Sequence, residues 1–408
     1  MFARALVLLG VLGVLGVLGG CGAQTPPPAR PRAPRPEVPV RLSEPPRPTE
    51  PAPPGQAAVT WRRVETAADL PPPPAPGTFQ LHLIDVGTGL AILIRGADFA
   101  MLYDAGTNDP GEKPLRVAAY LAATLGPSGD DLCVPPGTPL PRARRRLEHV
   151  VLSHPHADHA SALDLVLHCY DVGHFWDPGR LVQTAFYRDL MAQLARSAPT
   201  TYHTAAVVPD DRAVAVKGHR VTIPRWERFS EGDAVPLGAG ARFTILHAEP
   251  KPSGNPNGSS LVVRVELGGT RVLLVGDAES GARRDPSEPP AGLEAYLIAQ
   301  HAPALRADIL QVGHHGSKTS SRRAFLQAVG PKVALVSSGP RQYSGTTLPD
   351  PEVIAALGAV GATILRTDLR DASCPVTGRI GGDAGPGGCD TWVVTIDGRA
   401  AGVLDPGP

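Results

Sequence analysis

The chain has 408 residues, of which 42% are hydrophobic, and its 39 Lys and Arg residues balance its 39 Asp and Glu residues. A chain without net charge has no overall basic field to attract nucleic acid. This balance counts against a processive nucleic-acid binder, although it leaves room for local basic patches.

The N-terminus predicts a bacterial lipoprotein signal. Residues 1–20 hold one early Arg and an apolar run of Leu, Val and Gly, too short and Gly-rich for a good spanning helix. Small residues lead directly to Cys21, so we expect cleavage before Cys21 and lipidation of its thiol; an ordinary signal peptide with an incidental Cys is the alternative. We therefore expect an exported protein of the periplasm or cell envelope that contacts the membrane through its lipid anchor only. An outer membrane is one of the membranes to which this anchor could attach it.

Residues 21–77 are rich in Pro and Ala, and we expect a disordered linker that acts as an extended spacer. A short amphipathic piece near residues 59–70 is expected to dock locally. Residues 78–408 then remain, enough for one large α/β domain with insertions, which we expect to be a monomer.

From Phe79 onward, apolar runs bounded by Gly predict strands, and apolar residues at helical spacing predict helices. The predicted strands, in chain order, are 79–85, 90–95, 99–103, 148–152, 242–246, 261–267, 271–275, 309–312, 333–337, 363–366 and 391–396. The predicted helices are 114–125, 160–168, 181–196, 292–300, 321–329 (with Ser320 as N-cap) and 351–357. Strands and helices alternate across two halves, which favours helices packed outside a pair of sheets.

Four cysteines remain if Cys21 is lipidated, and an even number in an exported protein suggests disulfides. Cys374 with Cys389 would close a Gly-rich loop, and Cys133 could pair with Cys169. Four cysteines allow three connectivities, and free buried thiols are the alternative. No Cys-x-x-Cys spacing is present, which argues against a zinc ribbon.

The strongest chemical signal is the run of His154, His156, Asp158 and His159 at the end of a predicted strand. Three imidazoles and a carboxylate within six residues suit one or two divalent metal ions such as Zn or Mn. Alternation in an extended loop aims His154 and His156 one way, while Asp158 and His159 can face a second position. Two such ions would share a bridging hydroxide and clamp a phosphoryl or carbonyl oxygen. A solvated His-rich loop is the alternative.

Two further segments follow predicted strands. Asp277 is placed to bridge two metals, although Gly-Asp after a strand is often only a turn. Two adjacent histidines, His314 and His315, cannot easily point into one cleft, so we expect one ligand and favour His314, nearest the strand end. His315, Ser317 and Lys318 would then contact an anionic substrate. Two solvated loop histidines are the alternative.

Asp104 also follows a strand, and we expect it to hold the His loop in place rather than to bind metal. Asp158 and Asp277 are the two carboxylates that we expect to be catalytic.

Together, Asp104, the His154 run, Asp277 and His314 resemble the metallo-β-lactamase superfamily in their order along the chain. Over residues 79–367 the chain is similar to the hydrolase domain of the ComEC competence proteins. The similar segments are Ile84-Asp85-Val86-Gly87-x-Gly89, Leu152-Ser153-His154-Pro155-x-x-Asp158-His159, Asn257-x-x-Ser260-Leu261-Val262, Leu274-x-Gly276-Asp277-Ala278-Glu279 and Val312-Gly313-His314-His315-Gly316-Ser317-x-Thr319-Ser320.

The resemblance implies an αββα sandwich with the metals at one edge between the two sheets. It also implies a nuclease-like hydrolase, and it adds Asp85 to the residues that contact substrate or support the site. In that family the domain is attached to a DNA-uptake channel; we see no channel helices here and expect no direct transport role.

The sequence departs from the family pattern at three places. Many superfamily members have a third His for the first metal, where this chain has Asn257; His247 is an alternative ligand. The segment from Tyr343 to Thr347 lacks the His that ComEC-like domains tend to carry. Thr88 and Leu90 replace the polar residues usual in the first glycine turn.

These features favour a metal-dependent phosphodiesterase or nuclease acting on an anionic substrate such as DNA or a nucleotide. The predicted helix after Ser320 would attract phosphate at its N-terminus, and Arg322 and Arg323 would add charge there unless they are merely solvated. An envelope hydrolase of esters, lactones or β-lactams is the second hypothesis, and the missing third His argues against a β-lactamase. A non-catalytic metal-binding lipoprotein is the third.

Overall fold

The computed structural model describes residues 58–109, 114–134, 143–252, 254–343, 345–375, 378–381, 385 and 387–398. The chain divides into two compact units, residues 1–44 and 45–408, and all described residues belong to the second. The predicted signal peptide, Cys21 and the linker before residue 58 lie outside the described residues.

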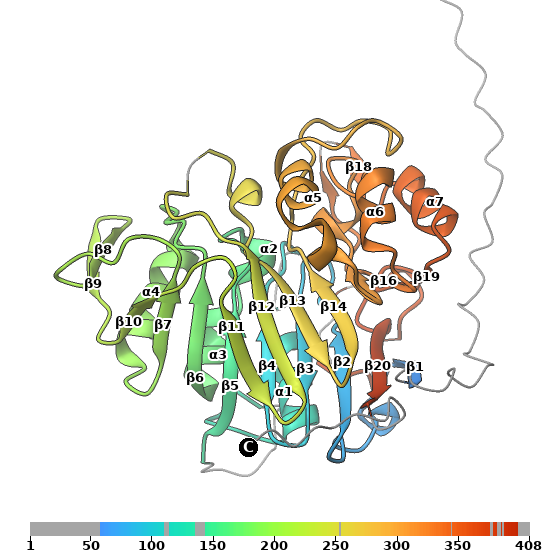
Figure 1. The fold of residues 1–408 in the computed structure, drawn as a ribbon. Coiled ribbons are helices and arrows are strands. Elements are labelled where there is room, and N and C mark those ends of the chain that lie inside the picture. Colours follow the sequence, from blue (N-terminus) through green and yellow to red (C-terminus); the bar gives the residue numbers. More distant parts are fainter. Residues whose placement is uncertain are drawn as a thin grey trace, which may run out of the picture. The chain divides into compact units, whose positions relative to one another are not determined.

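Two large β-sheets form the centre of this unit (Figure 1). The larger sheet has the spatial order β1 (Ala58–Val64), β20 (Thr391–Asp397), β2 (Thr78–Leu83), β3 (Ile92–Arg95), β4 (Ala100–Tyr103), β5 (Arg145–Val151), β6 (Tyr170–Asp177), β7 (Thr201–Thr204) and β10 (Trp226–Arg228). The smaller sheet has the order β11 (Ala234–Gly238), β12 (Ala241–His247), β13 (Val262–Leu267), β14 (Thr270–Leu274), β15 (Ile309–Gln311), β16 (Val333–Val336) and β19 (Thr363–Arg366). Two short hairpins stand apart, β8 (Ala213–Val216) with β9 (His219–Thr222) and β17 (Gln342–Tyr343) with β18 (Thr346–Thr347).

Helices cover the outer face of each sheet. The larger sheet carries α1 (Pro114–Leu125), α3 (Leu163–Cys169) and α4 (Ala185–Arg196), and the smaller sheet carries α5 (Gly292–Leu305), α6 (Arg323–Val329) and α7 (Pro351–Ala359). The single-turn helix α2 (Ala157–Ala160) lies near one end of the sheets in Figure 1. The predicted αββα sandwich is therefore confirmed.

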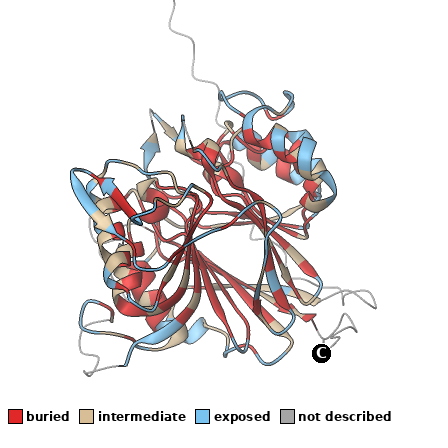
Figure 2. Cartoon of the chain, turned by 60° about the vertical axis from the view of Figure 1, so that its left-hand side comes forward, coloured by how far each residue is buried: buried red, intermediate tan, exposed pale blue. Residues whose placement is uncertain are grey.

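The strands have two buried faces because apolar residues alternate between two hydrophobic clusters. Leu81 and Leu83 of β2 pack between the sheets, whereas His82 points to the helix side and meets Tyr120 of α1. Leu273 of β14 likewise packs under the helices, although its neighbours in sequence pack between the sheets. Figure 2 shows the result, with both sheets largely buried and the exposed segments concentrated in loops and on the outer sides of helices. Each fully buried Leu, Val or Ile contributes roughly 1.5–3 kcal/mol, so this double-faced burial is the main source of stability.

The parallel part of each sheet decides where a site can form. Strands β4 to β7 run parallel in the larger sheet, and β14, β15, β16 and β19 run parallel in the smaller one. The carboxyl ends of parallel strands lie at one edge, and the loops that follow them form the usual ligand site of such sheets. Every segment predicted to carry chemistry, from Asp104 to His315, follows one of these strands or borders this edge.

The folded domain begins earlier than we predicted. Strand β1 pairs with β20 along its whole length, from Ala58 opposite Asp397 to Val64 opposite Thr391. The expected docking of residues 59–70 is met, but the assignment of residues 58–77 to a disordered linker is wrong. Val59 and Trp61 pack against the cluster between the sheets, which outweighs the two arginines that follow them in the strand.

Several elements between residues 170 and 238 escaped prediction. Strand β6 reads Tyr-Asp-Val-Gly-His-Phe-Trp-Asp, and its polar residues obscure the strand pattern. Asp177 is tolerated inside because it accepts hydrogen bonds from the Tyr187 hydroxyl at 2.9 Å and from the Gly179 amide.

Helix α6 starts at Arg323, and Ser320 is not its N-cap, because the Ser320 hydroxyl donates to the Gly313 carbonyl at 2.6 Å.

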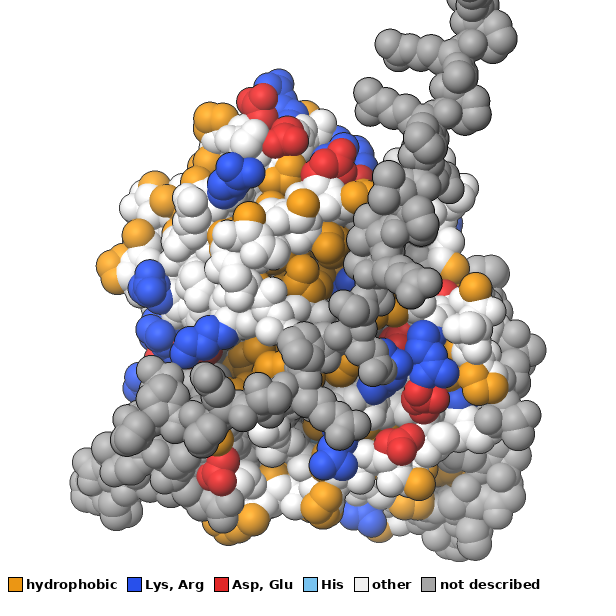
Figure 3. Space-filling view, turned by 90° about the vertical axis from the view of Figure 1, so that its right-hand side faces the viewer, with side chains coloured by type: hydrophobic (Ala, Val, Ile, Leu, Met, Phe, Trp, Pro, Cys, Tyr) orange, Lys and Arg blue, Asp and Glu red, His pale blue; other side chains and the backbone are white. Residues whose placement is uncertain are grey.

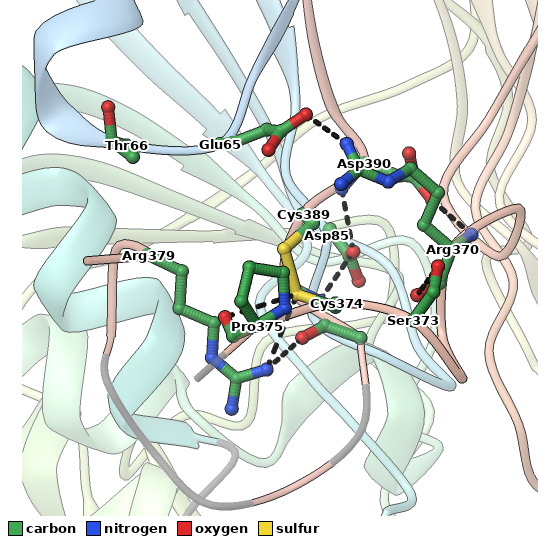
Figure 4. The surroundings of a disulfide bond; sticks show 12 residues. Glu65, Thr66, Asp85, Arg370, Ser373, Cys374, Pro375, Arg379, Cys389 and Asp390 are labelled. Carbon is green, nitrogen blue, oxygen red and sulfur yellow. Dashed lines mark hydrogen bonds and ion pairs between the residues drawn. A yellow bond between two sulfur atoms is a disulfide. The ribbon is translucent and has the colours of Figure 1, made fainter. Parts of the chain in front are cut away.

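Both predicted disulfides are present, Cys133–Cys169 and Cys374–Cys389. The second one ties down the C-terminal loop beside Asp85, Arg370 and Arg379 (Figure 4).

The helices that the structure describes all fall short of the length and hydrophobicity that a membrane span requires. On the face shown in Figure 3, the described Lys and Arg side chains lie among Asp and Glu side chains, in keeping with the balanced net charge.

The buried His82 makes stability sensitive to acid. Burial lowers the pKa of His82 to about 3 from the ordinary value of 6.5. As the pH falls below 6.5, His82 therefore takes up a proton in the unfolded chain but stays neutral in the folded chain. The contribution of His82 to the free energy of unfolding is fully present above pH 6.5 and is lost as the pH falls toward 3. Relative to His82→Gln, the wild-type chain is expected to lose about 1.4 kcal/mol per pH unit across this window. Urea unfolding between pH 6.5 and pH 3 measures how the free energy of unfolding of each protein changes with pH. The same pH dependence in the wild type and in His82→Gln would contradict this account.

Candidate metal centre

The loop from Ser153 to His159 follows β5 and is fixed by backbone contacts with two neighbouring loops. The Leu90 amide donates to the Asp158 carbonyl at 2.9 Å, and the Ala105 amide donates to the His159 carbonyl at 2.8 Å. Such close approach requires glycine: a Cβ atom at Gly89 would lie 2.1 Å from a backbone oxygen, and one at Gly106 would lie 2.4 Å from the His159 nitrogen. The two glycine turns therefore hold the His loop at the sheet edge.

A first group of potential metal ligands consists of His154, His156 and Asp277, whose ligand atoms all lie within 4.8 Å of one another. His154 Nε2 is 3.0 Å from His156 Nδ1 and 3.7 Å from Asp277 Oδ2. This group joins the loop after β5 to the turn after β14, one from each sheet.

A second group consists of Asp158, His159 and His315, again within 4.8 Å of one another. His315 Nε2 is 3.5 Å from Asp158 Oδ2 and 3.8 Å from Asp277 Oδ1. His159 Nε2 is 3.2 Å from the same Asp277 oxygen. Asp277 therefore stands between the groups, with Oδ2 toward the first and Oδ1 toward the second.

Three atoms of this arrangement indicate that the residues fit a metal ion. His159 Nε2, His315 Nε2 and Asp277 Oδ1 are buried and have no hydrogen-bond partner among the described residues. Buried polar atoms are almost always satisfied, and three orphaned ligand atoms converging on one point are explained by a cation there. Imidazole and carboxylate together suit Zn or Mn, although the donor set does not choose between them.

The opposite ring nitrogen of each second-group histidine is anchored. His159 Nδ1 donates to Asp104 Oδ2 at 2.7 Å, and His315 Nδ1 donates to the Ser337 carbonyl at 2.9 Å. Asp104 also accepts from the Ser153 amide and hydroxyl, each at 2.6 Å. A hydrogen bond on one nitrogen fixes the tautomer and presents the other nitrogen as a ligand. Asp104 lies where we expected it, holding the His loop.

The electrostatics separate the histidines into two kinds. Burial lowers the pKa of His154 well below its ordinary value and also lowers the pKa of His156, so both are neutral and ready to bind metal. Burial opposes charge on His159 as well, but Asp277 and Asp104 raise its pKa well above the ordinary value. Burial alone would raise the pKa of Asp277, yet the surrounding histidines hold it well below its ordinary value. Metal binding at the second group must therefore displace a proton from His159.

Our expectation that His314 completes the second group does not match the structure, where His315 lies with Asp158 and His159. The premise that two adjacent histidines cannot share a cleft is also wrong. His314 (φ 49°) and His315 (φ 54°) are both in the left-handed region, which is uncommon outside glycine. This backbone turns both imidazoles toward Asp277, at 3.7 Å for His314 and 3.8 Å for His315.

The groups open into a cavity of about 820 Å³. Its wall includes Arg283, which is paired with Asp350 at 2.6 Å and donates to the Ser317 hydroxyl at 3.0 Å. Tyr343 also lines the cavity, and its hydroxyl donates to Asp158 Oδ2 at 3.3 Å. The rest of the lining is mixed, with apolar positions at Pro155, Val182, Phe186 and Leu348 and polar ones at Asn108, Thr184, Asn257 and Thr319.

Several residues proposed from the sequence lie elsewhere. Asp85 accepts hydrogen bonds from the Gly388 and Asp390 amides at 2.6 and 3.1 Å, so it holds the C-terminal loop (Figure 4). His247 is bonded to the Ser260 carbonyl at 2.7 Å and lines a different cavity. Lys318 pairs with Glu352 at 2.8 Å instead of pointing to the site.

The predicted phosphate contact by Arg322 and Arg323 is also not supported. Arg322 is buried and donates to the carbonyls of Ala282, Arg284 and Asp285, and Arg323 is exposed and absent from the cavity wall. Sequence reasoning missed Arg283, Tyr343 and Glu279 as site residues. Only Glu279 carried a signal, since it lies two residues after Asp277.

The support that Asp104 gives to His159 can be measured. In Asp104→Asn the amide can still accept from Ser153 but cannot replace the carboxylate on His159 Nδ1, so the ring loses its fixed orientation. We expect metal affinity to fall about 10–100-fold, measured by competition with a coloured chelator, with the exposed Asp131→Asn as control. A folded Asp104→Asn protein that binds metal as tightly as the wild type would contradict this role.

Comparison with known proteins places these observations in a family. The model of the metallo-β-lactamase superfamily matches residues 84–339. Competence protein ComA of Neisseria gonorrhoeae is 28% identical over 288 residues, covering 71% of this chain and 31% of that protein. The uncharacterized protein YcaI of Escherichia coli is 28% identical over 280 residues, covering 69% of this chain and 28% of that protein. The chain thus spans less than a third of the length of these relatives.

Among solved structures, the metallo-β-lactamase fold protein YhfI from Bacillus subtilis is similar over 71% of this chain and 96% of its own, with 12% identity and a TM-score of 0.39. The match of the family model extends from Ile84, at the end of β2, past the last of the histidines to Gly339. The chain belongs to the metallo-β-lactamase superfamily.

Proposed function

We propose that this protein is a divalent-metal-dependent hydrolase that cleaves phosphodiester bonds in a nucleic acid or nucleotide. The observation that carries the proposal is the position of Asp277, whose two oxygens face two separate groups of ligands across the sheet edge. Two divalent ions bound there would lower the pKa of a water molecule and polarise the phosphoryl oxygens of a substrate.

The chain's own residues supply position and charge around that centre. Asp277 and Asp158 put negative charge beside both groups, while His154 and His156 remain neutral donors of lone pairs. Asp104 and Ser337 prevent rotation of His159 and His315. The reacting centre is thereby rigid before substrate arrives, which is the condition for electrostatic catalysis.

Two side chains of the cavity wall are suited to an anionic substrate. Burial, together with the charge of Asp158, raises the pKa of Tyr343 above its ordinary value, so its hydroxyl stays protonated and can donate to a phosphoryl oxygen. Arg283 offers a guanidinium that Asp350 and Ser317 hold in one orientation. Similarity to a protein named for competence supports DNA as the substrate class.

We further propose that the protein acts in the cell envelope, tethered through Cys21 by the Pro-rich segment. The two disulfides support an oxidising compartment outside the cytoplasm. Labelled palmitate fed to expressing cells is expected to enter the wild-type chain and not Cys21→Ser, and equal labelling of both would contradict lipidation at this residue.

The activity is tested with the purified metal-loaded chain on a bis-aryl phosphodiester, single-stranded DNA and a chromogenic β-lactam. We expect turnover of the first two, lost by a factor on the order of 10²–10³ in Asp277→Asn because an amide has one oxygen ligand and no charge, and can no longer be shared by the two groups. Asp285→Asn, an exposed Asp at the protein surface, is the matched control and should keep full activity.

Turnover of the β-lactam alone would contradict the phosphodiesterase proposal. Bound metal without turnover of any of the three substrates would instead favour a non-catalytic metal-binding protein.

A further inference from the structure

We propose that His314 is the third imidazole ligand of the first group, in place of the histidine that Asn257 replaces. The inference deepens the proposed function, since it rests on metal ions being bound at the centre. The first site would then consist of His154, His156, His314 and the shared Asp277. The loop after β15, which carries His314, would contribute to this site as well as to the second one.

The position of the His314 ring supports this assignment. His314 Nε2 is 3.7 Å from Asp277 Oδ2, the same oxygen that lies 3.7 Å from His154 Nε2. Two ligand atoms bound tetrahedrally to one Zn²⁺ at about 2.0–2.1 Å lie about 3.3 Å apart. The two spacings to Asp277 Oδ2 are within a few tenths of an ångström of that value.

His314 Nδ1, the ring nitrogen that would not bind the metal, has the hydrogen-bond partners that are usual for a metal-binding histidine. His314 Nδ1 is 2.9 Å from Glu279 Oε1 and 2.6 Å from the Thr319 hydroxyl. Metal-binding histidines almost always donate their other ring N–H to a carboxylate, a carbonyl or water, which leaves the remaining lone pair for the metal. Glu279 therefore fixes the His314 ring through Nδ1, as Asp104 fixes the His159 ring.

Glu279 is itself positioned by the loop that lacks the expected histidine. Asn257 Nδ2 donates to Glu279 Oε1 at 3.1 Å, and Asn255 Nδ2 donates to Glu279 Oε2 at 2.9 Å. The amide nitrogen of Asn257 is thus committed to the carboxylate, whereas Asn257 Oδ1 is buried and has no hydrogen-bond partner among the described residues. Asn257 therefore supports the first site through Glu279 and His314.

The backbone of the His-His turn agrees with a role for both rings. A loop carrying a single ligand has no need for two successive non-glycine residues at positive φ, and such conformations persist where the surrounding structure imposes them. His314 keeps 25% of its side chain exposed and His315 only 3%, and both rings line the cavity.

The test counts metal and needs no substrate. The full chain is loaded with Zn²⁺, filtered, and assayed for bound metal and for affinity by chelator competition, as wild type, His314→Gln, His315→Gln and the double variant. We expect two ions in the wild type, a loss of about one ion or at least a tenfold weaker site in each single variant, and loss of both in the double variant. Glu279→Gln, which keeps the shape and removes the charge, should weaken one site about 10–100-fold.

His219→Gln, an exposed histidine on β9, is the matched control, and thermal unfolding checks that each variant is folded. Wild-type metal content and affinity in folded His314→Gln would overturn the inference. So would a double variant that loses only the ion lost by His315→Gln, because both histidines would then serve one site. A wild type that cleaves no phosphodiester while His314→Gln loses one ion would keep this inference and remove the proposed activity.

Discussion

The arrangement depends on one buried carboxylate. Asp277 is 1% exposed, and an ionised carboxylate at such a position is very costly unless charges and hydrogen-bond donors surround it. Four imidazoles supply that surrounding: His154 and His314 face Oδ2, and His159 and His315 face Oδ1. Because the four come from two loops of different sheets, Asp277 also links the two halves of the sandwich at the edge where the site lies.

The fold explains why these residues meet. Each sheet has a parallel segment, and the loops after β4, β5, β14 and β15 therefore gather at one edge. The hydrophobic interior between the sheets is continuous up to that edge, with Tyr103 donating its hydroxyl hydrogen to the Leu261 carbonyl of the opposite sheet at 3.0 Å. The His loop is thus attached to a rigid frame, which is what fixed ligand positions require.

The supporting residues form matching pairs on the two sides of Asp277. Asp104 holds His159, and Glu279 holds His314, each through a carboxylate on Nδ1. Both carboxylates are in turn held by neighbouring side chains or amides, Asp104 by Ser153 and Glu279 by Asn257. Loss of a histidine from the usual place in the chain is compensated in this arrangement by a histidine from another loop together with its own carboxylate.

The sequence predicted the sandwich and most of the site because strand ends, Gly turns and the His run are local signals. It favoured His314 over His315 for the second group, which the structure does not match, because the outcome depends on a left-handed turn that the sequence of two histidines does not predict. The family resemblance placed Asp85 at the site, yet its hydrogen bonds run to Gly388 and Asp390, about 300 residues away in the chain. Strand β6 was missed because its polar residues find partners only in the folded state.

The central claim is that Asp277 is shared by two metal ions in one centre. Electron paramagnetic resonance of the Mn²⁺-loaded chain tests this claim directly, because two ions joined by a common ligand are magnetically coupled. The account predicts two Mn²⁺ per chain and the spectrum of a coupled pair, which changes to that of isolated ions in Asp277→Asn. A wild-type spectrum of a single, uncoupled Mn²⁺ would contradict it.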